Sequence, residues 1–489
     1  MNGLTRSIRV GDPNVLEIHI EPSHDPDGEQ SKTWATFELV VRNMNLTEYT
    51  YGGRLHRVTW YVDDIALWLA SQWDFITHEE RTPTPLAQKQ PWEALMDFEP
   101  NEDGSGQETV SAWSDWRYRH GLQTAADGGL LPDVFFRRQG DALEVSWGPS
   151  LPLGIPDDVR FTADPVSVFL PLDAAAETLW QALNQLAPLL DERSPQVAGQ
   201  IRRELTKLQT VEAKTHRKQL LLGGRGDFGS LDAVNRSAPS LLDGQKSRLD
   251  VVEADFPLAT LVRSMDPDFV GDDLEVVLSY LKAGQPSPEL RETIDQVSPV
   301  MDLWLRPHAN GWELGREAAR VFAQRFQLNS GSEVTNVDAL IRRLGIDVHG
   351  VTFQTKASGA AISLLGGTRP LILIETKNGQ RSEQQRFRLM CQMYHIVSTR
   401  PSNYSAMLAS DWAPSIKVQA SRAFAAWTLM PEAKCRHVWR TTEGNTADRA
   451  IVVAQRFGVS RLTALNHLHD LMLVSSVDRD ATAEAWTFG

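Results

Sequence analysis

The chain has 489 residues, of which 42% are hydrophobic and 23% charged, as is usual for a globular protein of two or three domains. Its formal net charge of −14 argues against a large non-specific nucleic-acid surface, although it leaves room for a local basic patch. Only two cysteines are present, which excludes a disulfide framework and fits a reducing cytosol.

The chain shows no sign of a membrane segment. Residues 1–16, MNGLTRSIRVGDPNVL, lack a continuous apolar core, so we expect no signal peptide. No run of about 18 apolar residues occurs, so we expect no transmembrane helix and no membrane partner. The expected location is therefore the cytoplasm.

Residues 1–192 predict an α+β domain that senses a signal or recruits a partner. The hairpin should turn at Gln139-Gly140-Asp141, because glycine favours tight turns between strands. The predicted elements are strands at 14–21 and 34–44, a strand passing into a helix over 57–76, a polar loop over 91–108, a helix over 110–122, the hairpin over 132–148, and a strand followed by a helix over 167–192.

This part of the chain is rich in aromatic side chains, which allows two interpretations. Large aromatic residues most often pack in a core, but they also form recognition surfaces. The candidates for such a surface are Trp68, Trp73, Phe75, Trp113, Trp116, Arg117 and His120.

Residues 193–305 predict a helical linker region that contains the most basic stretch of the chain. The stretch is either a solvated helix face or a contact site for nucleic acid or another anionic partner. The candidate residues, within 202–225, are Arg202, Arg203, Lys207, Lys214, Arg217, Lys218 and Arg225.

Residues 306–489 predict a third, α+β domain. Ser460 should cap the second helix of the last pair, because serine favours the N-cap position. That second helix carries only Arg461 as a strong cation, so it is a poor candidate for reading DNA. The predicted elements are a helix over 310–328, a helix and strand over 337–353, a hairpin over 359–376, helices over 386–397 and 415–431, and a helix pair over 448–474.

The segment 386–397 reads RFRLMCQMYHIV and contains residues that could form a metal site or a catalytic site. Cys391 and His395 are four residues apart, so a helix places both side chains on one face. Both residue types bind metals, and a thiol beside an imidazole could also act as a nucleophilic pair.

Six segments resemble, in order, the ImmA/IrrE family of zinc metallopeptidases: GWELGREAARVF, LIRRLGIDV, the hairpin, RFRLMCQMYHIV, AFAAWTLMP and AQRFGVSRLTALNHL, all within 310–474. The resemblance implies a zincin-like fold with an HExxH helix. The first histidine of that motif falls on Cys391, the glutamate on Gln392 and the second histidine on His395. The third ligand, a glutamate of the following helix, falls on Ala420.

These replacements predict a degenerate, pseudopeptidase domain with no catalytic residue and no cofactor. Neutral Gln392 cannot take a proton from water, so the general base is lost. In the simplest case the helix is a scaffold, with Cys391 buried and His395 hydrogen-bonded in the core. Two alternatives stay open: an active endopeptidase whose zinc site is rebuilt with His437 or His467, and the Cys391–His395 nucleophilic pair.

The resemblance also implies a biological setting. Relatives of this type are bacterial stress or prophage regulators, and some belong to toxin–antitoxin or phage-defence systems. We therefore expect a cytosolic bacterial regulator whose degenerate domain binds a protein partner without cleaving it. Nucleic-acid binding through 202–225 is the alternative that uses the basic stretch.

Overall fold

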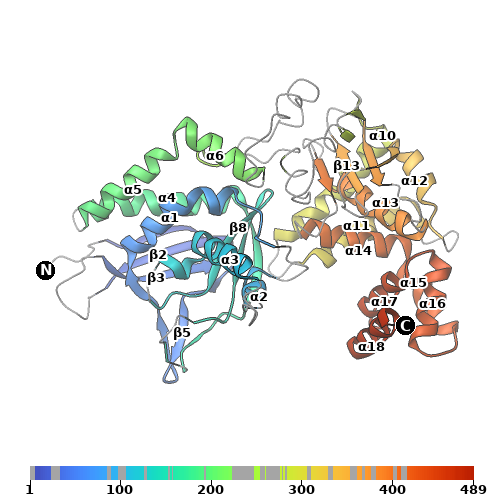
Figure 1. The fold of residues 1–489 in the computed structure, drawn as a ribbon, viewed down its shortest axis with the longest axis horizontal. Coiled ribbons are helices and arrows are strands. Elements are labelled where there is room, and N and C mark those ends of the chain that lie inside the picture. The colour runs from blue at the N-terminus through green and yellow to red at the C-terminus, as the bar shows by residue number, and fades with distance from the viewer. Residues whose placement is uncertain are drawn as a thin grey trace. The chain divides into compact units, whose positions relative to one another are not determined.

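The computed structural model describes residues 6–23, 33–84, 90–96, 106–125, 129–151, 155–156, 158–191, 194–222, 247–253, 259, 276–277, 279–280, 284–305, 310–328, 334–352, 361–365, 369–375, 382–399, 405–408 and 416–488. They divide into two compact units (Figure 1). Unit 1 holds the described residues up to 253, and unit 2 holds those from 259 onward. Both units combine helices with sheets, so the predicted α+β class is confirmed.

Unit 1 is built on an antiparallel sheet, packed against two long helices, α1 (Val62–His78) and α4 (Leu172–Asp191). Alternate residues of β3 are buried, as expected for a strand with one face toward a core. The apolar faces of the two helices and the sheet enclose one hydrophobic cluster. The strands are β1 (Ile8–Asp12), β2 (Leu16–Pro22), β3 (Trp34–Val41), β4 (Met44–Asn45) and β7 (Thr59–Tyr61).

Two smaller antiparallel sheets complete the strands of unit 1. The predicted hairpin is confirmed as β8 (Val134–Gln139) and β9 (Ala142–Trp147), with Gly140 at a φ of 60° in the turn. The strand β11 (Val166–Pro171) pairs with β9. A separate sheet joins β5 (Glu48–Tyr51), β6 (Arg54–Arg57) and β10 (Arg160–Phe161).

The other helices of unit 1 correct one prediction. Within 91–108, predicted as a loop, the chain forms α2 (Pro91–Met96), because Pro91 suits the first helical position and Glu93 accepts a hydrogen bond from the Gln90 amide at 2.6 Å. The helix α3 (Gln107–His120) is longer than predicted and runs into the short η1 (Leu122–Ala125).

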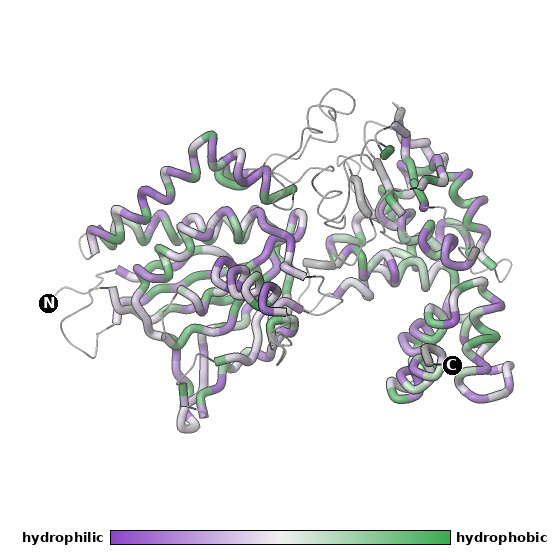
Figure 2. The backbone as a smooth tube through the Cα atoms, viewed as in Figure 1, coloured by the Kyte–Doolittle hydropathy of each residue, from purple (hydrophilic) through white to green (hydrophobic). Residues whose placement is uncertain are grey.

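The helices predicted as a middle region divide between the two units. In unit 1, α5 (Pro195–Lys207) and α6 (Val211–Leu221) pack on α1 and show long hydrophilic stretches (Figure 2). In unit 2, α10 (Pro288–Val297) packs against α11 (Gly311–Arg325) and continues into η3 (Ser298–Leu305). The division of the sequence at residues 192 and 305 stays a prediction about sequence modules. Most of residues 255–284, which belong to the predicted helical linker region, lie outside the described residues.

The sheet of unit 2 has the order β12–β14–β13–β15. The strand β12 (Asp347–Val351), which follows α12 (Val337–Leu344), runs parallel to β14 (Leu371–Glu375). The predicted hairpin of β13 (Ala361–Leu365) and β14 is confirmed, and β15 (Ser405–Leu408) adds to the edge at β13. The helices α13 (Ser382–Val397) and α14 (Ile416–Leu429) pack against each other, and α13 also contacts the sheet.

The chain ends in a cluster of helices, α15 (Glu432–Thr441), α16 (Thr446–Phe457), α17 (Arg461–Asp470) and α18 (Ser476–Phe488) (Figure 1). The predicted cap is confirmed, because the Ser460 hydroxyl accepts a hydrogen bond from the Thr463 amide at 3.1 Å. Arg386 of α13 donates to the carbonyls of Phe457 and Gly458 at 3.2 and 2.7 Å, which fixes the α16–α17 turn to the domain. No helix among the described residues is both long and apolar enough to span a bilayer.

Candidate functional site

The positions that correspond to the peptidase motif lie where α13 meets α14 in unit 2. The helix α11 packs closely on α14, because Gly315 has no side chain at the contact. A Cβ atom there would lie 2.1 Å from the carbonyl oxygen of Ala420 and 2.6 Å from the Cβ of Ala423. Aromatic contacts continue this core, with the rings of Phe322 and Phe424 5.2 Å apart.

The helix α13 places the motif residues inside the protein. Cys391, Gln392 and His395 are each at most 4% exposed, and Ala420 of α14 is fully buried. A peptidase needs its zinc ligands and general base at a surface that a substrate chain can reach. In this arrangement the four positions belong to the packed interior between α13 and its neighbours.

Burial also decides the charge of the two reactive groups. It raises the pKa of the Cys391 thiol to about 12, so the thiol stays protonated at neutral pH. Burial, assisted by nearby Lys417, lowers the pKa of His395 to about 3, so its imidazole is neutral. A protonated thiol is a weak nucleophile, which argues against the Cys391–His395 nucleophilic pair.

His395 differs in one respect from the predicted scaffold residue. It is buried, as expected, but its Nε2 has no hydrogen-bond partner among the described residues. The neighbouring Tyr394 hydroxyl, in contrast, donates to the sulfur of Met301 at 3.0 Å. A buried ring nitrogen without a hydrogen-bond partner lowers the free energy of unfolding, because its lost contact with water is not replaced.

The residues present do not fit a catalytic zinc ion. Ala420 offers no donor atom at the position of the third ligand, and Gln392 offers only a weak neutral oxygen. Of the candidates for a rebuilt site, His437 is exposed, and His467 donates from Nε2 to the Met430 carbonyl at 2.9 Å. Within the described ranges, no three His, Cys, Asp or Glu side chains lie close enough together to hold a metal.

The basic candidates of 202–225 separate into three groups. Arg217 was predicted as a contact for an anionic partner, but its side chain is fully buried and cannot serve as one. Arg225 lies outside the described residues. The remaining five are exposed on α5 and α6, where Arg202 pairs with Asp191 and Lys207 pairs with Glu204; they are Arg202, Arg203, Lys207, Lys214 and Lys218. Their binding of an anionic partner stays a prediction.

The predicted aromatic recognition surface is not formed. The tryptophans pack in the core, as the alternative interpretation expected. Trp68, Trp73, Trp113 and Trp116 are buried, while Phe75 and Arg117 are only partly exposed. His120 is also buried: its ring stacks on Trp116 at 4.4 Å, and its Nδ1 donates to the Phe136 carbonyl at 2.7 Å. Trp116, whose ring stacks on Phe135, and His120 hold α3 against β8.

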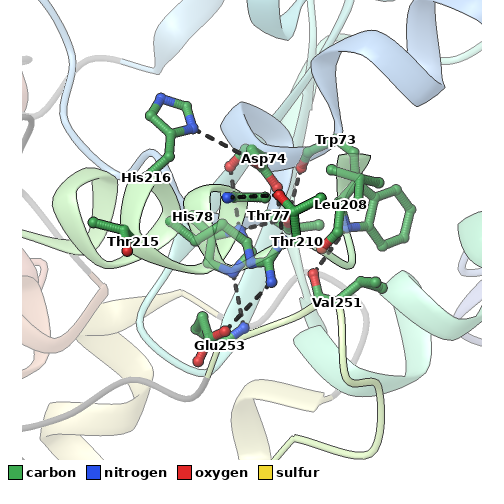
Figure 3. A network of polar contacts seen from close by, with 12 residues as sticks. Trp73, Asp74, Thr77, His78, Leu208, Thr210, Thr215, His216, Val251 and Glu253 are labelled. Carbon is green, nitrogen blue, oxygen red and sulfur yellow. Dashed lines mark hydrogen bonds and ion pairs between the residues drawn. The ribbon is translucent and has the colours of Figure 1, made fainter. Parts of the chain in front are cut away.

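Unit 1 contains a buried polar network that the sequence did not predict (Figure 3). Arg217 of α6 donates to the Leu208 carbonyl at 2.8 Å, and its guanidinium lies 3.4 Å from both Asp74 of α1 and Glu253. We call Asp74, Thr77, His78, Arg217 and Glu253 the α1–α6 network. It fixes α6 and the segment 247–253 to α1.

The hydrogen bonds of His78 define its protonation in that network. The Glu253 amide donates to Nε2 at 2.8 Å, so Nδ1 carries the proton and donates to the Thr77 hydroxyl, also at 2.8 Å. Burial, together with the charges of Arg138 and Arg217, lowers the pKa of His78 well below its ordinary value. Because both ring nitrogens are occupied, His78 serves as a structural connection. One feature of the sequence could have predicted this network: Asp74 and His78 lie one turn apart in an otherwise apolar helix, where two polar side chains need buried partners.

Comparison with known proteins gives one match, which lies in unit 2. A search among curated proteins found no match. Residues 342–469, which span the end of α12 through α17, match the family model described as the IrrE N-terminal-like domain, Peptidase_M78. The C-terminal part of the chain therefore contains an ImmA/IrrE-like domain.

Proposed function

We propose that this protein is a regulator whose ImmA/IrrE-like domain binds a protein partner and does not cleave it. The observation that carries the proposal is the state of the motif positions. Gln392 replaces the general base, Ala420 replaces a ligand, and Cys391 and His395 are enclosed in the core. The frame of the family is kept while its chemistry is absent, as expected for a domain retained for binding.

The terminal helices offer apolar side chains for such a partner. Met472 and Val477, in and just after the α17–α18 connection, are 92% and 76% exposed. Met472 has a φ of 56°, a left-handed conformation that is unusual for a residue with a side chain. A flexible thioether held outward suits contact with an apolar partner surface, because methionine adapts to varied shapes.

The setting implied by the family resemblance completes the proposal. We place the protein in the bacterial cytoplasm, in stress regulation or in a phage-defence or toxin–antitoxin system. Unit 1 then serves as the sensing or recruiting part. The exposed cations of α5 and α6 leave a contact with nucleic acid as a secondary role, limited by the acidic charge of the whole chain.

The test is to capture the partner from the native host with the full chain and to follow its mass. After mixing purified partner with wild-type protein and added zinc, we expect a stable complex and an intact partner. A Gln392→Glu variant should also leave the partner intact, because a restored carboxylate still lacks a complete ligand set at Cys391 and Ala420. Partner fragments produced by either protein would contradict the proposal.

The same capture experiment, done with substituted protein, tests whether the partner binds at Met472 and Val477. Met472→Asp combined with Val477→Asp should weaken capture, since burying a carboxylate at an apolar contact is unfavourable. The control is Asp480→Asn on α18, an exposed position that changes charge without removing apolar area. Equal capture by the double variant and the control would move the contact away from the α17–α18 connection.

A further inference from the structure

Unit 1 contains a polar groove between α1 and α5. Its volume is about 560 Å³, within the range of roughly 300–1,000 Å³ that is typical of small-molecule sites. The edge of α3 and η1 closes one side. The polar side chains that matter for recognition are Gln72, Tyr118, Gln200, Arg203, Glu204 and Lys207.

Helix α5 presents a stripe of polar side chains to the groove. On α5, Gln200, Arg203 and Lys207 follow one another at intervals of three and four residues, so they share one face. The buried anchors of that helix are Ala198 and Ile201, which lie on its other side. A pair of packed helices normally buries apolar stripes, so the polar side chains of α5 that line the groove are not part of the helix contact.

The cations of the groove suit a phosphate group. Arg203 is exposed and forms no ion pair or hydrogen bond within the described part of the chain. Lys207 lies one turn further along and pairs with Glu204 at 2.6 Å. A guanidinium matches the geometry of a phosphate with two parallel hydrogen bonds, and the lysine adds a second positive charge.

Tyr118 of α3 supplies an aromatic ring to the lining of the groove. Its side chain is 59% exposed, although its backbone is fixed. The Tyr118 carbonyl accepts hydrogen bonds from the Trp68 indole at 3.1 Å and from the Thr124 hydroxyl at 3.0 Å. An exposed aromatic ring on a fixed backbone is the kind of platform on which a nucleobase stacks.

We propose that this groove binds a mononucleotide, with its phosphate on Arg203 and Lys207 and its base against Tyr118. The amides of Gln72 and Gln200 can donate to and accept from the polar edges of a base. Asp64 and Glu204 also line the groove, and their negative charges oppose a run of phosphates, so one nucleotide fits better than a nucleic-acid strand. This inference concerns unit 1 and does not depend on the role of the ImmA/IrrE-like domain.

Calorimetric titration of the full chain with adenosine and guanosine 5′-monophosphates tests the proposal. We expect saturable binding of at least one of them, with inorganic phosphate and the free nucleoside each binding more weakly. Tyr118→Ala should weaken nucleotide binding roughly tenfold, as expected for one lost stacking contact. Arg203→Gln should weaken it by a similar factor and reduce its dependence on salt.

Lys214→Gln is the matched control, because Lys214 is an exposed cation on α6 that does not line the groove. Circular dichroism checks that each variant is folded, which we expect because Tyr118 and Arg203 are exposed. Binding of neither mononucleotide would overturn the proposal. Equal losses in Lys214→Gln and Arg203→Gln would also overturn it, by showing general attraction of anions. So would phosphate binding as tight as nucleotide binding and insensitive to Tyr118→Ala.

Discussion

Replacing Arg217 with methionine should lower the free energy of unfolding of unit 1 by about 3–5 kcal/mol, the usual cost of breaking a buried ion pair. Arg217 is fully buried, and its guanidinium lies 3.4 Å from the carboxylates of Asp74 and Glu253. Without it, the Asp74 carboxylate keeps, among the described residues, only the partly exposed His216 as an ionic partner. Burial already raises the pKa of Asp74 against the influence of Arg217.

Denaturation in urea, followed by hydrogen exchange of α6 and of segment 247–253, measures this effect and localises it. Lys218→Met is the matched control, because it makes the same kind of change at the exposed neighbouring position. A surface change of this kind should alter stability by less than about 1 kcal/mol. The double variant Arg217→Met with Asp74→Leu should recover part of the loss, since no unpaired charge then remains. Equal stabilities for Arg217→Met and Lys218→Met would show that the α1–α6 network does not stabilise the unit.

Unit 2 should lose stability in acid because it encloses two neutral histidines. Burial lowers the pKa of His395 to about 3 and that of His467 to about 4, from an ordinary value of 6.5. The unfolded chain therefore binds more protons than the folded one below pH 6.5. Stability falls as the pH drops from 6.5 toward the folded pKa values, by about 1.4 kcal/mol per pH unit for each histidine. At a pH of about 4.5, each contributes a loss of roughly 3 kcal/mol.

Urea denaturation at neutral pH and at the acidic pH, with wild type and His395→Leu, isolates this contribution from that of the carboxylates. The variant should keep its stability near neutral pH, because leucine replaces a ring whose Nε2 has no partner among the described residues. In acid it should be the more stable protein by roughly 3 kcal/mol. Identical pH profiles for the two proteins would contradict the assignment of a buried neutral His395.

Local patterns in the sequence predicted much of the fold. The hairpin of β8 and β9 follows from alternating side chains around Gly140, and the start of α17 follows from Ser460 as its cap. These signals act over a few residues. The parallel pairing of β12 with β14 and the added strand β15 depend on partners far apart in the chain, which local periodicity does not specify.

The candidate site shows the same limit. The resemblance to ImmA/IrrE proteins located Cys391, Gln392, His395 and Ala420, and the helices α13 and α14 place these residues in one core. Nothing in the sequence around Arg217 distinguishes it from the exposed Lys214 and Lys218. Arg217 is buried because α6 packs on α1, which brings its guanidinium beside Asp74. Local sequence patterns do not specify this packing. The groove at Arg203 likewise depends on how α5 meets α1.

We propose that the ImmA/IrrE-like domain keeps the fold of the family without a catalytic zinc ion. Elemental analysis of the full chain, purified without chelators, incubated with zinc and then dialysed, tests this most directly. We expect the wild type and a Cys391→Ala, His395→Leu variant to retain the same zinc content, well below one ion per chain. One zinc ion per wild-type chain that is absent from the variant would contradict it, because the two buried residues would then be metal ligands.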